Sequence, residues 1–262
     1  MRFQRILNHL RHRRFLLVFG PSGSGKSSLI QAGLLTRLHD GRHFPSGIWL
    51  ARELRPGDQP VQALGAAIGQ IGEPSQVVAK LLADHPPAQR LLLVIDQFEE
   101  LFTQAPREEQ AHFIRLLQDL RLIRECTILI AMRADFYADL MNSDLWPIAP
   151  SQRLEISPLR GATLRRAIQQ PAMDVGVRLE ADLVERLLAD AADEPGALPL
   201  VQETMTLLWA EMQGHVLPLS AYERLSSGGR SGLAVALAMK ADATLDDLPA
   251  PQQEIARRIF LP

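Results

Sequence analysis

The stretch that decides the fold runs from residue 15 to residue 27 and reads FLLVFGPSGSGKS. It opens with an uninterrupted apolar run, which is typical of a strand buried on both faces of a parallel sheet. Residues 20–27 then match the pattern Gly-x-x-x-x-Gly-Lys-Ser/Thr, and a helical pattern begins at Ser27. Glycines let such a loop curl so that its backbone N–H groups point inward, and the following helix presents its positive end. This order predicts a phosphate-binding loop.

The side chains of this loop have separate expected roles. Lys26 is expected to reach the β- and γ-phosphates of a nucleotide, and the Ser27 hydroxyl to ligate Mg²⁺. The implied cofactors are therefore ATP or ADP together with Mg²⁺. The predicted nucleotide-binding residues of the loop are Gly20, Pro21, Ser22, Gly23, Ser24, Gly25, Lys26, Ser27 and Ser28.

Similar apolar runs recur along the first part of the chain, with helical patterns between them. The runs are 47–50, 91–95, 127–131 and, more weakly, 153–156; the helical patterns are 3–10, 27–38, 61–71, 77–83 and 108–120. Strands that alternate with helices indicate an α/β domain with a doubly wound parallel sheet, in which helices cover both faces in a three-layer arrangement. We assign residues 1–156 to this nucleotide-binding domain.

The strand-like runs stop after residue 156, and we place a domain boundary near Ser157–Pro158. Helical stripes at 163–169, 183–188, 198–212, 222–225, 233–239 and 252–260 predict an all-α second part. Pro171 is expected to end the first of these helices. We predict a helical lid domain at 157–226. Residues 227–262 are interpreted as a linker and helices leading to a further domain, because the chain stops on apolar residues.

Composition excludes several classes of protein. The 262 residues carry 28 Lys and Arg against 30 Asp and Glu, so no global positive field exists to hold a nucleic acid, and such a partner is not expected. Cys126 is the single cysteine, which excludes an intramolecular disulfide and a cysteine-based zinc cluster. No apolar run reaches the length of a membrane span, and arginines interrupt any signal-peptide core, so we expect a cytoplasmic protein without a membrane partner.

The N-terminal helix is locally basic in spite of the balanced overall charge. We interpret this face either as a solvated helix surface or as a contact for a nucleic acid or a partner protein. It is made by Arg2, Arg5, His9, Arg13 and Arg14.

A second motif, RLLLVID at residues 90–96, is an apolar strand that ends in a carboxylate. In P-loop proteins such a carboxylate lies beside the phosphate loop and holds Mg²⁺, directly or through water, so Asp96 and Ser27 are the predicted metal ligands. ATPases with an added strand between the two motifs mostly place a Glu directly after this Asp. Here Gln97 stands in that position, and the carboxylates follow at Glu99 and Glu100.

The run DQFEELF at residues 96–102 resembles the Asp-Gly-Leu-Asp-Glu arrangement of NACHT-type NTPases. More closely, it resembles the bacterial STAND (signal-transduction ATPase with numerous domains) group called novel STAND NTPases. The resemblance covers nearly the whole chain, because four further segments agree: GPSGSGKSSLIQAG at 20–33, LEISPLRGATLRRAIQQPA at 154–172, PGALPLVQETMTLLW at 195–209 and LSAYERL at 219–225.

This resemblance implies a P-loop NTPase core with a helical lid, acting as a slow, Mg²⁺-dependent ATPase. It further implies a switch in which ADP holds a closed monomer and ATP exchange permits homo-oligomerisation of a larger multidomain signalling protein. Relatives carry an adenine-contacting segment upstream and a winged helix downstream. We expect both to lie outside residues 1–262, so this piece of chain is expected to stay monomeric, and whether it retains nucleotide is left open by the sequence.

The resemblance also suggests catalytic roles. Gln97 cannot accept a proton at neutral pH, so the distal acids Glu99 and Glu100 are the candidates for acting on the attacking water. A helical turn there would point them about 100° apart, and Glu99 is favoured because it matches the first distal acid of the NACHT pattern. Arg133 matches the STAND sensor arginine that reports the terminal phosphate. The other interpretation is a surface arginine paired with Asp135.

Two glycine-containing segments lie in the second part of the chain. Pro199, in the run GALPL, resembles the Gly-x-Pro lid motif that packs on adenine, although the spacing is one residue longer and Gly and Pro also mark ordinary helix starts. Residues 225–230, LSSGGR, superficially resemble the ABC transporter signature. They follow the acidic strand instead of preceding it, so we interpret them as a flexible link.

Two other classes of function remain open from the sequence. An AAA-type DNA-loading ATPase shares the core and the lid, but it would place a Glu directly after Asp96 and would show a basic surface stripe. A nucleotide-sensing module without turnover would bind ATP and leave it intact.

Overall fold

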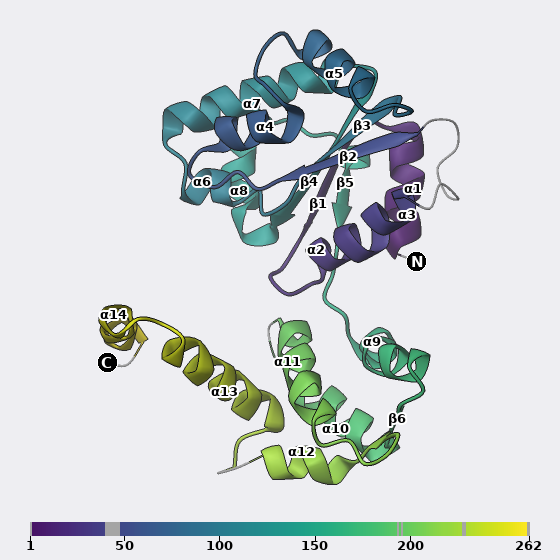
Figure 1. Ribbon diagram of the computed structural model, residues 1–262, viewed down its shortest axis with the longest axis vertical. Coiled ribbons are helices and arrows are strands. Elements are labelled where there is room, and N and C mark those ends of the chain that lie inside the picture. The colour runs from purple at the N-terminus through teal and green to yellow at the C-terminus, as the bar shows by residue number, and fades with distance from the viewer. Residues whose placement is uncertain (1, 40–47, 193, 195, 227–228, 261–262) are drawn as a thin grey trace. The chain divides into compact units, whose positions relative to one another are not determined.

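The computed structural model describes residues 2–39, 48–192, 194, 196–226 and 229–260 (Figure 1). It divides into two compact units, Met1–Ser157 and Pro158–Pro262. The predicted strand start at residue 47, the predicted link at 227–228 and the chain end at 261–262 lie outside the described residues.

The first unit is built on a five-stranded parallel sheet. Its strands are β1 (Phe15–Gly20), β2 (Trp49–Leu54), β3 (Arg90–Ile95), β4 (Cys126–Arg133) and β5 (Arg153–Glu155), in the order β2-β3-β4-β1-β5. The predicted α/β class is thus confirmed, and β4 is the added strand between β1 and β3. β2 continues beyond the apolar residues from which it was predicted. It is an edge strand that is only partly buried, so it also carries polar residues.

Helices cover both faces of this sheet (Figure 1). On one face lie α1 (Arg2–His12), α2 (Lys26–Ser28), a π-helical segment (Leu29–Leu35) and α3 (Thr36–His39). On the other lie α4 (Pro60–Ile68), α5 (Pro74–Ala83) and α7 (Arg107–Leu122). Shorter helices follow the ends of β3 and β4: α6 (Glu100–Thr103), a 3₁₀ turn (Ala134–Phe136) and α8 (Tyr137–Met141). A further 3₁₀ turn (Pro150–Gln152) leads directly into β5.

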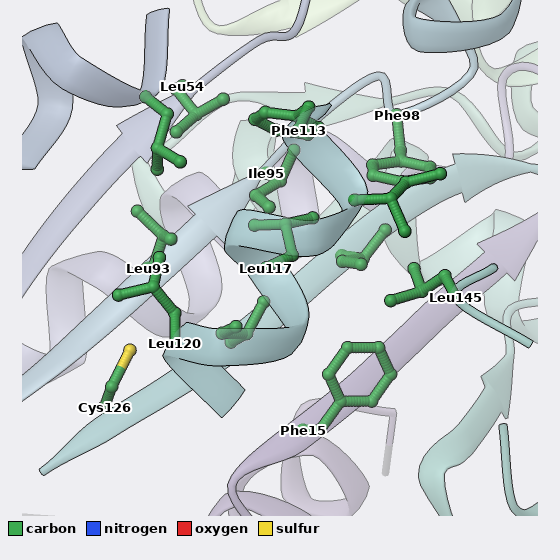
Figure 2. Close-up of a cluster of buried hydrophobic side chains, with 14 of the residues drawn as sticks. Phe15, Leu54, Leu93, Ile95, Phe98, Phe113, Leu117, Leu120, Cys126 and Leu145 are labelled. Atoms are coloured by element: carbon green, nitrogen blue, oxygen red, sulfur yellow. The ribbon is translucent and has the colours of Figure 1, made fainter. Parts of the chain in front are cut away.

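The sheet is buried on both sides because alternate strand residues enter different cores. Leu93 and Ile95 of β3 pack with α7, whereas Leu92 and Val94 pack with the layer that contains α1. Figure 2 shows the α7 side of this arrangement, where Phe113, Leu117 and Leu120 lie over the strand side chains. Burial on both faces explains the uninterrupted apolar runs, and it fixes the strand register, since a slip of one residue would exchange the two faces.

Cys126 begins β4 and is fully buried in the α7-side core (Figure 2). Burial raises the pKa of its thiol to about 12. The thiol therefore stays protonated at neutral pH and acts as a small apolar group.

The second unit is mainly helical and has a core of its own. Its helices are α9 (Gly161–Asp174), α10 (Ala181–Asp190), α11 (Ala197–Trp209), α12 (Leu219–Leu225), α13 (Gly232–Asp246) and α14 (Ala250–Phe260). α13 packs against α11 and α12. The second unit is mainly helical, as expected from the sequence, whereas its role as a lid and its predicted division at residue 226 stay predictions. No helix in the described part of the chain is long and apolar enough to cross a membrane.

Two details of the second unit differ from expectation. Strands β6 (Arg178–Leu179) and β7 (Val216–Leu217) form a small parallel sheet, so the unit is not entirely α-helical. Strands this short carry no periodicity that a sequence pattern could reveal. The prediction that Pro171 ends its helix was also wrong. α9 continues through it to Asp174, because Ala172, buried in the core, anchors the last turn.

The α7-side core generates a stability prediction. Leu117→Ala should lower the free energy of unfolding of the first unit by about 2–5 kcal/mol, because a fully buried leucine leaves a cavity. Leu122→Ala is the matched control, since Leu122 lies on the same helix and is 78% exposed. Urea denaturation followed by circular dichroism measures both. Equal losses in the two variants would contradict the described core.

Candidate nucleotide site

The predicted phosphate loop connects the end of β1 to the start of α2. Gly23 and Gly25 have φ values of 68° and 85°, in the left-handed region that favours glycine. Gly25 is the N-cap of α2, so the chain enters the helix directly from this turn. The loop therefore takes the tight path that its glycines predicted, next to a helix start.

Gly20 is required for a different reason, which is close approach. A Cβ at this position would lie 2.2 Å from the backbone oxygen of Ile156. Ile156 is held there because its N–H donates to the carbonyl of Phe19 at 2.8 Å, which continues the pairing of β1 with β5. The beginning of the loop is thus pressed against the segment that follows β5.

Lys26 folds over the loop, and its ammonium donates to the carbonyls of Gly20 and Pro21, each at 2.9 Å. Burial lowers the pKa of Lys26, and the negative charges of Glu99 and Asp96 oppose that shift. The amine is therefore within electrostatic range of two acids that come from the end of β3.

Ser27 and Asp96 meet although 69 positions separate them: the Ser27 hydroxyl donates to Asp96 Oδ1 at 3.1 Å. The Gln97 N–H donates to the same oxygen at 3.0 Å. Asp96 is 2% exposed, and its Oδ2 is buried without a hydrogen-bond partner among the described residues. A hydroxyl beside a carboxylate with a spare oxygen fits Mg²⁺, which prefers hard oxygen ligands.

The chain turns sharply after Asp96. Gln97 has a φ of 52°, in the left-handed region that only glycine adopts without strain. The turn is held by Phe98, whose N–H donates to the carbonyl of Ala131 in β4 at 3.0 Å and whose ring is fully buried. The residues that follow are therefore held beside the end of β4.

The two distal acids diverge at this turn. Glu99 Oε2 accepts a hydrogen bond from the N–H of Arg133 at 3.1 Å, at the end of β4. Glu100 Oε2 accepts one from the N–H of Gly57 at 3.2 Å, in the segment that follows β2. Glu99 thus lies on the side of the phosphate loop, and Glu100 lies on the side of the sheet edge.

Arg133 is the last residue of β4 and pairs in register with Gly20. Its Nη2 forms an ion pair with Asp135 Oδ2, and its guanidinium carbon lies 5.7 Å from the ring centre of Phe136. The hydrogen bond from Arg133 lowers the pKa of Asp135. The pairing with Asp135 that the sequence left open is therefore present, at a position beside the phosphate loop.

The structure thus gathers six of the predicted site residues at the carboxyl ends of β1, β3 and β4: Gly20, Lys26, Ser27, Asp96, Glu99 and Arg133. Of the others, Ser22 is exposed on the loop, Ser24 is buried, and Ser28 is exposed at the end of α2. Pro199 is an exposed residue in the first turn of α11, in the second unit.

Sequence reasoning missed two contributors to this region. Gly57 supplies the N–H that holds Glu100, and Ala131 supplies the carbonyl that holds the turn at Phe98. Both contacts are made by backbone atoms, so the residue types at these two positions do not indicate them. The sequence suggests Asp135 only as an ion-pair partner for Arg133.

Comparison with known proteins gives a family and a fold. The family model of novel STAND NTPase 1 matches residues 2–262. No curated protein matches the chain. Among solved structures, the fold is similar to a chain of Drosophila ORC bound to DNA, with a TM-score of 0.55 and 14% identity over 97% of this chain and 76% of that one. It is also similar to a Walker-type ATPase of Pyrococcus abyssi, with a TM-score of 0.57 and 12% identity over 98% and 75%.

The close approach at Gly20 generates a second prediction. Gly20→Ala should lower the free energy of unfolding by about 1–3 kcal/mol, since its methyl group would displace backbone at Ile156. Gly65→Ala is the control: in the interior of α4 a Cβ would lie 3.4 Å from its nearest neighbour, and alanine is the better helix former by up to about 1 kcal/mol. Thermal denaturation compares them, and a neutral Gly20→Ala would contradict the described packing.

Proposed function

Because this chain belongs to the novel STAND NTPase 1 family, we propose that it is an ATP-operated signalling switch that binds and slowly hydrolyses ATP with Mg²⁺. The family and the fold support a nucleotide-binding ATPase of the P-loop class. The switch, the slow turnover and the ATP-driven assembly of a larger protein are proposed from the resemblance to STAND proteins.

One observation carries the assignment of the site. The Ser27 hydroxyl meets the Asp96 carboxylate across the end of β4, and the second carboxylate oxygen is buried without a described partner. Leaving a buried carboxylate oxygen without a partner is costly for a purely structural residue, whereas it is useful for binding a cation. Ser27 and Asp96 would hold Mg²⁺. The ion, when bound, neutralises charge on the β- and γ-phosphate oxygens.

Phosphate binding follows from the loop and from Lys26. Backbone N–H groups at a helix start attract anions, and the Lys26 ammonium adds a mobile positive charge beside them. Lys26 donates to two loop carbonyls, so it can exchange those neutral acceptors for phosphate oxygens, which give stronger charge-assisted hydrogen bonds.

Water activation is assigned to Glu99. Gln97 has no basic group, and Glu100 is engaged with Gly57 on the side of the sheet edge. Glu99 is held by a backbone N–H of β4 and lies within electrostatic range of Lys26. In the proposed reaction its carboxylate orients the attacking water and accepts its proton as the oxygen attacks the γ-phosphorus. The bond between that phosphorus and the β,γ-bridging oxygen breaks in the same step, and ADP is the leaving group. Glu100 is assigned the supporting role of tying the turn to the segment after β2.

Arg133 is the proposed sensor of the terminal phosphate, because it ends the strand between Asp96 and the phosphate loop. A guanidinium can bind phosphate oxygens with two parallel hydrogen bonds. The role of Pro199 as an adenine contact rests on the Gly-x-Pro resemblance alone. Homo-oligomerisation of the full-length protein in its ATP state rests likewise on the family resemblance.

Two observations distinguish the proposed function from its two alternatives: the residue type at position 97, and whether the chain hydrolyses ATP. A DNA-loading ATPase of the AAA type would carry an acid directly after Asp96, and this chain carries Gln97. A sensing module would bind ATP without cleaving it, so single-turnover hydrolysis by the unmodified chain distinguishes that function from an ATPase.

Binding is tested at Lys26. Lys26→Ala should weaken ATP affinity about 10- to 100-fold, because a charge-assisted contact of this kind contributes roughly 1.5–3 kcal/mol. Lys80→Ala removes an equal charge from the exposed surface of α5 and should leave affinity unchanged. Titration with a fluorescent ATP analogue measures both. Equal affinity of Lys26→Ala and the parent would overturn the phosphate-loop assignment.

Catalysis is tested at the distal acids. Glu99→Gln should keep ATP binding but lower single-turnover hydrolysis about 100-fold or more, within the range of general-base catalysis. Glu100→Gln should lower it less, since an amide oxygen still accepts the hydrogen bond from the Gly57 N–H. Full activity in Glu99→Gln would remove Glu99 from the mechanism.

A further inference from the structure

The guanidinium of Arg133 is engaged by an anion of the chain itself. Its Nη2 forms an ion pair with Asp135 Oδ2, and the two side chains are 42% and 52% exposed. Its Nε is buried without a hydrogen-bond partner among the described residues. One nitrogen of the guanidinium group therefore holds a carboxylate, and a buried N–H donor of the same group has no partner among the described residues.

This ion pair lies beside the phosphate loop. Arg133 pairs in register with Gly20, the first residue of the loop motif. The charges of Arg133 and Asp135 both influence the pKa of Lys26, the first lowering and the second raising it. A phosphate bound at Lys26 and the Asp135 carboxylate would therefore be two anions within reach of one guanidinium.

We propose that Asp135 is a positioning residue that competes with the γ-phosphate for Arg133 and thereby sets the preference of the site for ATP over ADP. The proposal rests on the proposed function, since it needs a nucleotide at the phosphate loop. With ADP, Asp135 keeps the guanidinium; with ATP, the guanidinium turns to the γ-phosphate and the Asp135 carboxylate returns to solvent.

The strength of the pair suits this role. Exposed ion pairs contribute little, up to about fivefold in an equilibrium constant, so a phosphate with a larger charge and bidentate geometry can displace the carboxylate. The backbone of Arg133 need not move, because its N–H holds Glu99 independently of the side chain. A side-chain variant of Arg133 therefore keeps that hydrogen bond.

The experiment compares the affinities for ATPγS and ADP by calorimetry in the presence of Mg²⁺. Asp135→Asn should raise the affinity for ATPγS relative to ADP about two- to fivefold, because Arg133 no longer has to leave a carboxylate. Asp139→Asn is the matched control and should leave the ratio unchanged, since it removes an exposed carboxylate one turn further along, in α8.

Repeating Asp135→Asn in an Arg133→Ala background separates competition from simple repulsion. In the Arg133→Ala background, Asp135→Asn should no longer change the ratio of ATPγS affinity to ADP affinity, because no guanidinium is left for the carboxylate and the phosphate to share. The proposal is overturned if the effect persists in that background, or if Asp135→Asn changes both affinities equally. A parent chain that binds neither nucleotide would instead refute the proposed function, so the two failures are distinguishable.

Discussion

The hydrogen bond between Ser27 and Asp96 depends on the register of β1, β4 and β3, the three neighbouring strands at the centre of the first unit. Both faces of these strands are buried, so no strand can slip without exchanging its two cores. The register places the end of β4 between the phosphate loop and the acid after β3. The hydrogen bonds from Ser27 to Asp96 and from Arg133 to Glu99 then join groups that lie at or just after the ends of these three adjacent strands.

A second constraint is the turn that follows Asp96. The left-handed conformation of Gln97 carries strain, and the buried ring and backbone hydrogen bond of Phe98 hold it in place. The same turn separates Glu99 from Glu100 and directs them to β4 and to the segment after β2. One local backbone shape therefore decides that the two acids after Gln97 contact different segments.

Arg133 connects these constraints. Its backbone N–H holds Glu99, its backbone pairs in register with Gly20, and its side chain forms an ion pair with Asp135. A long charged side chain at the end of a buried strand has its backbone held by the sheet, while its charged group can rotate. It can therefore change partners without disturbing the sheet. This property is the physical basis of the sensor role proposed for Arg133.

Local patterns in the sequence were sufficient for the strands, the glycine-dependent loop and the family, because apolar runs, glycine positions and motif spacing reflect the behaviour of neighbouring residues. Tertiary structure alone decided which of Glu99 and Glu100 lies near Lys26, and that a Cβ on Gly20 would meet the backbone of Ile156. It also decided the short pair β6 and β7 and the passage of α9 through Pro171. Each of these depends on contacts with residues distant in the chain, such as Ile156 beside Gly20, and no local pattern encodes such contacts.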